Sequence, residues 1–320
     1  MIFFYILIFT GSCLLLAMSG KWLIDALIKI ARYLDWREFV IAFIVMAIAA
    51  SLPNLFVGIS AALHKIPELS FGDVIGGNLI DLTLVIALSV LIAKGIMAKS
   101  RTVQTTSIFT ALSAILPLIL ILDGVLGRLD GIILLVGFVF YSFWLFSKKE
   151  RFRKVYDSQE DSFGAVKNFK TFLKSVGKLV LGVVCFLLAA EGVVRSAFFF
   201  SKELNLPLSL IGILIVGLGN SLPEAYFSII SARSGQTWMI LGDLEGSVMV
   251  PSTLVLGTVA LIYPIKIPDF SPFAIGCLFL VAASLFFFLF VRSDRKLTVR
   301  EGIFLLGIYI TFLFIEIFVK

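Results

Sequence analysis

Two carboxylic acids, Glu224 and Asp81, stand in the middle of long apolar stretches of the sequence. Glu224 directly follows Pro223 and lies three residues after Ser221. A buried carboxylate is normally paired or coordinates a metal, because a bare charge in an apolar interior is costly. We therefore predict that Glu224 and Asp81 bind a metal cation, with a structural hydrogen bond between helices as the alternative. The sequence offers no nucleophile and base pair for catalysis.

Short polar blocks around these two acids supply further oxygen atoms. Hard cations prefer carboxylate, hydroxyl, amide and carbonyl oxygens. Pro53 and Pro223 each lie within a predicted helix, where a proline either only kinks the helix or also frees carbonyl oxygens that can bind a cation. The other predicted cation-binding side chains are those of Ser51, Asn54, Asn78, Asn220, Ser221 and Ser247.

Three more acids, Asp73, Asp243 and Glu245, fall near the predicted starts of helices rather than at their centres. Helix capping and attraction of cations into the site explain that position equally well. We predict that these three residues line a vestibule.

The elements that must position these residues are transmembrane helices. Apolar residues make up 60% of the chain and charged residues 15%, and the mean hydropathy is +1.07. A span of ~20 apolar residues crosses the ~30 Å hydrocarbon core as one helix. We predict an all-α membrane protein that contacts the lipid bilayer and binds no nucleic acid, because its basic residues collect in short loops. The predicted helices cover residues 2–33, 39–64, 70–97, 103–122, 126–146, 173–202, 208–233, 239–263, 270–291 and 299–318.

The two halves of the chain are related by an internal repeat. SLPN at 51–54 matches SLPE at 221–224, and GDVIGGN at 72–78 matches GDLEGSV at 242–248, each 170 residues later. Five helices per copy is an odd number, so the second copy must be inserted in the opposite sense. The predicted units are a first five-helix repeat at 1–147, a linker at 148–172 and a second repeat at 173–320.

Basic residues are distributed unequally between the two sets of loops. One set, which includes the linker, contains 18 lysines and arginines. By the positive-inside rule the linker is predicted to be cytoplasmic and both termini to lie outside. The plasma membrane of a prokaryote is the expected location. The opposite set contains five, which are Lys65, Arg128, Lys202, Lys266 and Lys320.

The blocks SLPN and SLPE, each followed 18 residues later by a glycine-rich block, resemble the two alpha-repeats of the sodium/calcium exchanger family. The resemblance spans essentially the whole chain. It implies ten helices in two inverted repeats around a central cation site. By position, Glu224 matches the calcium-binding glutamate of the second repeat and Ser221 its hydroxyl ligand, while Ser51 and Asp81 match polar ligands of the first.

The chain also departs from the usual motifs of that family. Asn54 replaces the first-repeat glutamate, and Ala50 and Asn220 replace threonines. Gly77 replaces a serine, and Pro251 replaces an Asp or Asn. The loss of the first glutamate removes one negative charge, which Asp81 can restore to a total of minus two.

The leading hypothesis is a secondary antiporter that exchanges Ca²⁺ for Na⁺ by alternating access, without a cofactor. A cation/proton or monovalent-cation antiporter of the same fold is the alternative that Asn54 favours. An intramembrane aspartyl protease using Asp73 and Asp243, and a paralogue that does not transport, are remote alternatives. Inorganic cations are the predicted ligands, and the sequence predicts no particular protein partner.

Overall fold

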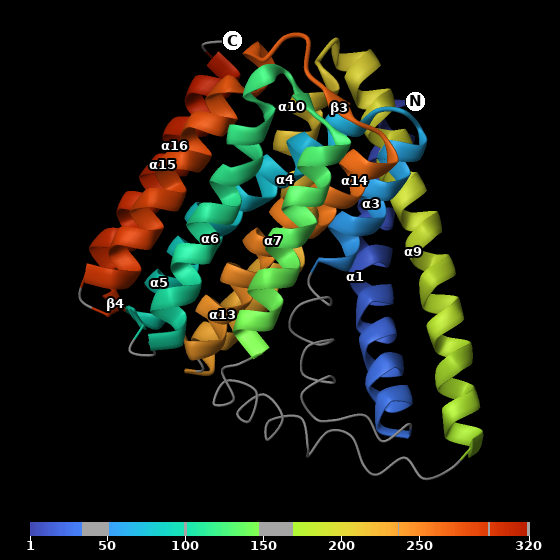
Figure 1. The fold of residues 1–320 in the computed structure, drawn as a ribbon, viewed down its shortest axis with the longest axis horizontal. Helices are drawn as coiled ribbons and strands as arrows, with labels where there is room; N and C mark the ends of the chain where they lie inside the picture. Colours follow the sequence, from blue (N-terminus) through green and yellow to red (C-terminus); the bar gives the residue numbers. More distant parts are fainter. Residues whose placement is uncertain (34–50, 99–100, 147–168, 236, 294, 319–320) are drawn as a thin grey trace.

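A computed structural model describes residues 1–33, 51–98, 101–146, 169–235, 237–293 and 295–318 (Figure 1). The first half contains α1 (Ile2–Tyr33), α3 (Leu52–Leu63), α4 (Pro67–Ile80), the π-helical turn η2 (Asp81–Val85), α5 (Ile86–Ala93), β1 (Ile96–Met97), α6 (Arg101–Leu120), the 3-10 turn η3 (Ile121–Asp123), β2 (Val125–Leu126) and α7 (Arg128–Phe146). The predicted linker falls largely outside these residues, as does the first part of the predicted helix 39–64.

The second half contains a similar series of elements. They are α9 (Phe169–Leu204), α10 (Leu208–Ile211), the π-helical turn η4 (Gly212–Val216), α11 (Gly217–Asn220), α12 (Leu222–Arg233), α13 (Thr237–Val250), the π-helical turn η5 (Pro251–Val255), α14 (Leu256–Ile262), β3 (Ile265–Lys266), α15 (Ser271–Ser293), β4 (Lys296–Leu297) and α16 (Val299–Phe318).

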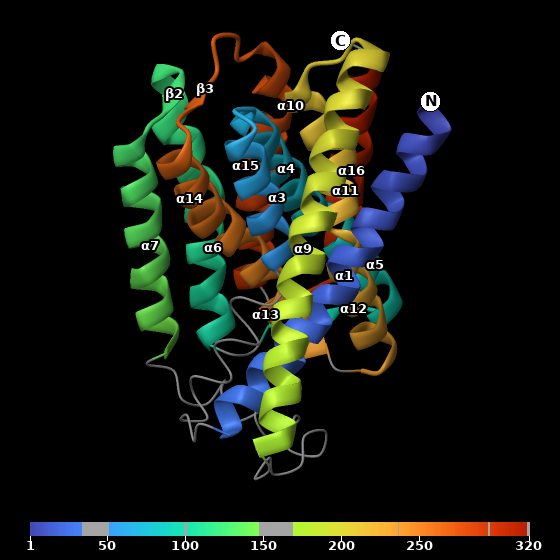
Figure 2. The ribbon, with the colours of Figure 1, turned by 90° about the vertical axis from the view of Figure 1, so that its right-hand side faces the viewer.

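The structure confirms the inverted repeat. Helices α3, α4 and α6 and turn η2 begin at residues 52, 67, 101 and 81, and α12, α13, α15 and η5 begin 170 residues later. Strand β1 pairs antiparallel with β4, and β2 pairs with β3. Each pair joins one strand from each half, and the two pairs lie at opposite ends of the bundle (Figures 1 and 2).

The helices are apolar enough to cross a membrane. Nine stretches of the described residues have the length and hydropathy of membrane spans, and Leu52–Leu63 is a shorter apolar helix. Large apolar side chains such as Phe143, Leu278 and Phe314 are more than half exposed, as expected for surfaces that face lipid. The predicted class of ten-helix membrane protein is thus confirmed in outline.

Proline and glycine residues make two helices differ from their predictions, one at its ends and one by an interruption. The predicted helix 70–97 begins at Pro67, whose fixed φ suits a first helical turn, and its helical part ends at Ala93. Lys94 and Gly95 then adopt positive φ values of 55° and 114°, which ends the helix before β1. The predicted helix 208–233 is interrupted at Ser221, because Pro223 has no N–H to donate to the preceding turn.

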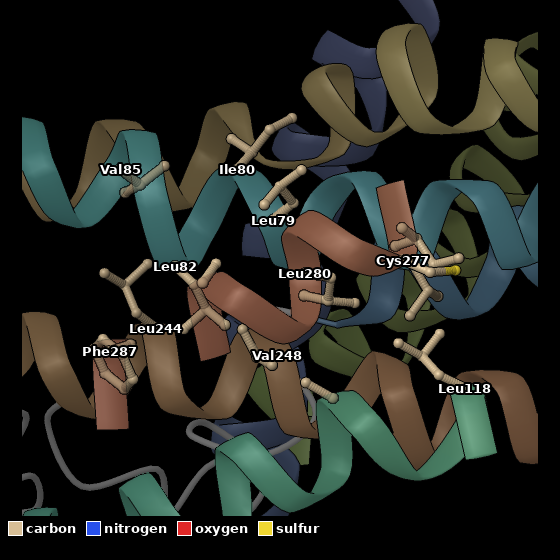
Figure 3. Close-up of a cluster of buried hydrophobic side chains, with 14 of the residues drawn as sticks. Leu79, Ile80, Leu82, Val85, Leu118, Leu244, Val248, Cys277, Leu280 and Phe287 are labelled. Atoms are coloured by element: carbon tan, nitrogen blue, oxygen red, sulfur yellow. The ribbon is translucent and has the colours of Figure 1, made fainter. Parts of the chain in front are cut away.

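Two apolar clusters hold the bundle together. The larger joins α4 and η2 to α6, α13 and α15 through residues such as Leu79, Leu82, Leu244 and Leu280 (Figure 3). The second packs α1 and α9 on each other and on α3 and η4 through residues that include Leu16 and Phe186. The long helices α1 and α9 therefore form a separate pair along one side of the molecule (Figures 1 and 2).

Candidate cation site

Helix α4 crosses the broken helix α10–η4–α11 with almost no side chains between them. A Cβ atom added at Gly76 would lie 2.1 Å from the Ile213 carbonyl oxygen, and one at Gly72 would lie 2.4 Å from the Ser209 carbonyl oxygen. One added at Gly217 would lie 2.7 Å from the Gly77 amide nitrogen. Small residues permit this close approach of membrane helices. The crossing places Asp81, which begins η2, beside the break at Ser221.

We expect Gly76→Ala to destabilise the protein, because the new methyl group would meet backbone that cannot move away. Overpacking of a well-packed core costs roughly 1–3 kcal/mol or more. Thermal unfolding of the purified protein in detergent should therefore begin at a clearly lower temperature. Gly137→Ala is the matched control, since a Cβ there meets nothing within 4 Å. Equal stability of the two variants would contradict the close crossing.

Asp81 is the centre of the hydrogen-bonded part of the site. Its side chain is 3% exposed, and the Ser247 hydroxyl on α13 donates a 2.6 Å hydrogen bond to its Oδ2 atom. The Ser221 hydroxyl also lies within hydrogen-bonding reach of Asp81, and donates to the Gly77 carbonyl oxygen at 3.4 Å. The structure thus brings the predicted residues Asp81, Ser221 and Ser247 together from both repeats.

Glu224 lies in the first turn of α12, directly after the break. Its side chain is 5% exposed, and its carboxylate interacts electrostatically with those of Asp81, Asp243 and Asp73. Among the residues whose burial is described, no lysine, arginine or histidine is buried. Carboxylates that are close together in an apolar interior repel one another and need positive charge between them. A bound cation would supply that charge.

Several oxygens of the predicted site are buried and have no hydrogen-bond partner in the described part of the chain. A buried polar atom without a partner costs about 1–3 kcal/mol, so binding a ligand through such atoms would be favourable. All are atoms that hard cations accept as ligands. They include Ser51 Oγ, Asn54 Oδ1, Asp81 Oδ1 and Glu224 Oε2. Outside this predicted set, Asp243 Oδ2 is also buried without a partner in the described chain.

Ser51 and Asn54 lie at the start of α3, in the position that Ser221 and Glu224 occupy at the start of α12. Pro53 and Pro223 take equivalent places in the first turns of the two helices. No hydrogen bond joins Ser51 or Asn54 to Asp81 or Glu224 among the described residues, so their place in the site remains a prediction.

Two predicted amide ligands are engaged elsewhere. Asn220 donates from Nδ2 to both carboxylate oxygens of Asp73, at 3.0 and 2.9 Å. Asn78 donates to the hydroxyl of Ser252 on η5 at 2.7 Å. Each amide keeps a carbonyl oxygen that can still accept a cation. Ser252 lies just after the matched sequence blocks and is not among the predicted site residues.

The predicted vestibule position is wrong for Asp73 and Glu245, because both side chains are 0% exposed. Helix α4 begins at Pro67, so Asp73 is nearly two turns inside it and faces Asn220. Glu245 points at α6, where the Thr106 hydroxyl donates to its carboxylate. Asp243 is partly exposed, but its Oδ2 atom is buried.

The acidic side chains do not form a compact metal cluster. In the described residues, no three His, Cys, Asp or Glu side chains are close enough to hold one metal ion. A cation bound between Asp81 and Glu224 would therefore take its remaining ligands from hydroxyl, amide and carbonyl oxygens. Two carboxylates neutralise one divalent ion or two monovalent ions, so the same oxygens suit Ca²⁺ and Na⁺ in turn.

A family profile matches most of the sequence. It covers residues 4–147 and 174–318, and the family is described as sodium/calcium exchanger protein. The match therefore includes nearly all of both repeats.

Individual relatives agree with that result. The sodium/calcium exchanger MaX1 of Methanosarcina acetivorans is 24% identical over 337 residues, covering 95% of this chain and 96% of its own. An uncharacterized membrane protein of Methanocaldococcus jannaschii is 28% identical over 304 residues, covering 94% of both chains. A structure of the sodium-calcium exchanger NCX_Mj soaked with 10 mM Na⁺ and zero Ca²⁺ superposes with a TM-score of 0.62 at 26% identity, covering 98% of this chain and 99% of that one.

Proposed function

This chain belongs to the sodium/calcium exchanger protein family, and from that membership we infer that it is a secondary active antiporter that exchanges Ca²⁺ for Na⁺. One structural observation carries the inference further. Asp81 and Glu224 are both buried and their carboxylates interact electrostatically, each keeps an oxygen without a hydrogen-bond partner in the described chain, and no buried basic residue is described near them.

The charge of this site suits the exchange. With both carboxylates ionised, Asp81 and Glu224 carry a charge of minus two, which one Ca²⁺ or two Na⁺ ions neutralise. Asn54 keeps an amide oxygen as a neutral ligand where the family motif has a second glutamate. We propose that Ser51, Asn54, Ser221 and backbone carbonyls at the two helix breaks complete the coordination.

We propose that α1 and α9 move together to expose the site to each side of the membrane in turn. These two helices pack mainly on each other, and their apolar cluster is distinct from the cluster around α4 and α13. They touch the site close to its break, since a Cβ at Gly219 would lie 2.9 Å from the Cys13 sulfur on α1. If α1 and α9 slid together, they would cover and uncover the part of the site near Gly219. The apolar cluster around α4 and α13 would stay intact.

We propose that the end of the bundle formed by β1, β4 and the α12–α13 turn faces the cytoplasm. Lys94 and Arg295 lie shortly before β1 and β4, Lys296 is the first residue of β4, and Arg233 ends α12. Basic loops are retained on the cytoplasmic side of a membrane. Both termini would then lie on the outer side, with the membrane being the plasma membrane of a prokaryote.

The protease alternative has no support in this arrangement. A shared-proton pair would require Asp73 and Asp243 to meet, whereas both oxygens of Asp73 accept hydrogen bonds from Asn220. The family match is to exchangers, and we propose no catalytic residue.

Calcium uptake into proteoliposomes tests the proposed function. We expect an outward Na⁺ gradient to drive accumulation of Ca²⁺, because two ion classes compete for the same carboxylates. An outward proton gradient, imposed with Na⁺ absent, should drive little or none. Accumulation driven by protons alone would replace sodium by protons as the coupling ion. Calcium flux that responds to neither gradient would contradict antiport.

A further inference from the structure

Asp243 is an acidic residue that is not among the proposed ligands of the main site, which is the site between Asp81 and Glu224. Its Oδ2 atom is buried, and no hydrogen-bond partner for it lies in the described chain. Its carboxylate interacts electrostatically with Asp81 and Glu224. Among the described residues no three such side chains are grouped closely enough to hold one metal ion, so Asp243, Asp81 and Glu224 do not surround a single position. A cation bound by Asp243 would therefore lie at a second position.

The hairpin of α12 and α13 locates that position. The Ser247 hydroxyl on α13 donates a hydrogen bond to Asp81, and the carboxylate of Glu224 on α12 interacts electrostatically with that of Asp81. Ser228 is four residues nearer than Glu224 to the turn that joins α12 and α13, and Asp243 is four residues nearer to that turn than Ser247. Four residues are one helical turn, or ~6 Å, so the two side chains lie at the same depth, one layer from the main site.

Ser228 also lacks a partner. Its side chain is 0% exposed, and its hydroxyl oxygen makes no hydrogen bond within the described chain. It lies on the buried face of α12 that also carries Glu224, and α12 packs against α13. The layer therefore contains a carboxylate oxygen and a hydroxyl oxygen, both buried and both without a partner.

Comparison of the repeats shows that this layer is specific to the second one. The equivalent of Asp243 is Asp73, whose two oxygens are satisfied by Asn220. The equivalent of Asn220 is Ala50, which lies outside the described residues and has no side-chain donor to offer. The equivalent of Ser228 is Gly58, which lies in close contact with Ser70 and Val259. In the first repeat the carboxylate oxygens are therefore hydrogen-bonded and the serine is replaced by a glycine. In the second repeat the carboxylate oxygen and the hydroxyl oxygen both remain without a partner in the described chain.

We propose that Asp243 and Ser228 hold one Na⁺ ion at a position separate from the Asp81–Glu224 site, displaced toward the α12–α13 turn. One carboxylate neutralises a monovalent ion, whereas a divalent ion would keep a net positive charge in an apolar interior. Sodium here repels a calcium ion at Glu224 and Asp81, so it favours calcium release. This inference rests on the proposed exchange of Na⁺ for Ca²⁺.

Sodium-dependent thermal stability of the purified, calcium-free protein tests the site independently of transport. A ligand that binds the folded state raises the unfolding temperature. We expect NaCl, compared with choline chloride, to stabilise the parent protein and to require about tenfold more sodium for half of the effect in Asp243→Asn. Ser228→Ala should shift the midpoint in the same direction with an intact fold. Glu203→Gln, at an exposed acid, is the matched control and should match the parent.

Transport by the same variants completes the test. In Asp243→Asn we expect the Hill coefficient for sodium to fall by about one, with Ca²⁺–Ca²⁺ exchange in sodium-free solution within twofold of the parent. Unchanged sodium dependence in both assays overturns the proposal. Equal loss of Ca²⁺–Ca²⁺ exchange overturns it too, because Asp243 would then belong to the main site. If sodium stabilises the parent more than Asp243→Asn yet drives no calcium uptake, the proposed function fails and the sodium position stands.

Discussion

Replacing Glu224 with glutamine is expected to abolish sodium-driven calcium uptake. The substitution keeps the shape of the side chain and removes one of the two charges that neutralise the ion beside Asp81. Removing one partner of a buried charge pair costs roughly 3–5 kcal/mol, and about 3 kcal/mol corresponds to more than 100-fold in affinity. Uptake into proteoliposomes and direct calcium binding to the purified protein should both fall by at least that factor.

The control for this prediction is Glu203→Gln, the same chemical change at an exposed position near the end of α9. It should transport like the parent. Thermal unfolding should show that Glu224→Gln is folded, since loss of a repelling buried charge does not weaken packing. Calcium transport within threefold of the parent would remove Glu224 from the site.

Replacing Asp81 with asparagine is expected to weaken calcium more than sodium. The asparagine oxygen can still accept the hydrogen bond from Ser247, so the local geometry is preserved. The lost charge matters more for a divalent ion, because electrostatic attraction scales with the charge of the ion. We expect the apparent calcium affinity to fall by roughly 10- to 100-fold, as for a buried charge-assisted contact of about 1.5–3 kcal/mol.

Competition between the two ions measures this difference. Calcium binding to Asp81→Asn should be displaced by a lower sodium concentration than calcium binding to the parent. Ser247→Ala is the matched comparison, since it removes the hydrogen bond and keeps the charge. If Asp81→Asn and Ser247→Ala lower calcium affinity equally, Asp81 acts through the hydrogen bond between helices and not through its charge.

The positions of Gly76, Asn220 and Asn78 show where reasoning from the sequence reached its limit. The motif blocks indicated that polar residues and glycines would gather at mid-membrane depth, and the structure brings Asp81, Glu224, Ser221 and Ser247 together. The hydrogen bonds of Asn220 to Asp73 and of Asn78 to Ser252 span the two repeats. The partner that each amide meets depends on the way in which the helices of the two repeats cross.

The misplaced vestibule has a related cause. Asp73, Asp243 and Glu245 have similar positions relative to the predicted helix starts, so the sequence predicts the same surroundings for all three. In the structure Asp73 is held by Asn220, Glu245 faces Thr106 on α6, and Asp243 keeps an unpartnered oxygen near the main site. Asp243 and Glu245 are two residues apart on α13, so they face directions that differ by about 200°. Asp73 and Asp243 occupy equivalent positions in the two repeats and differ in the partner that the other repeat offers, which is Asn220 for Asp73.

For Glu224 and Asp81 the sequence alone predicted burial, a position within a helix and the inverted arrangement of the two repeats. The length of the apolar stretches and the 170-residue repeat were sufficient for these predictions. These properties depend on hydropathy and periodicity, which are written along the chain. Their mutual approach, the hydrogen bond from Ser247 and the separate position of Asp243 depended on contacts between residues about 140–166 apart. Such contacts are set by which helix faces meet, and only the packed tertiary structure decides that.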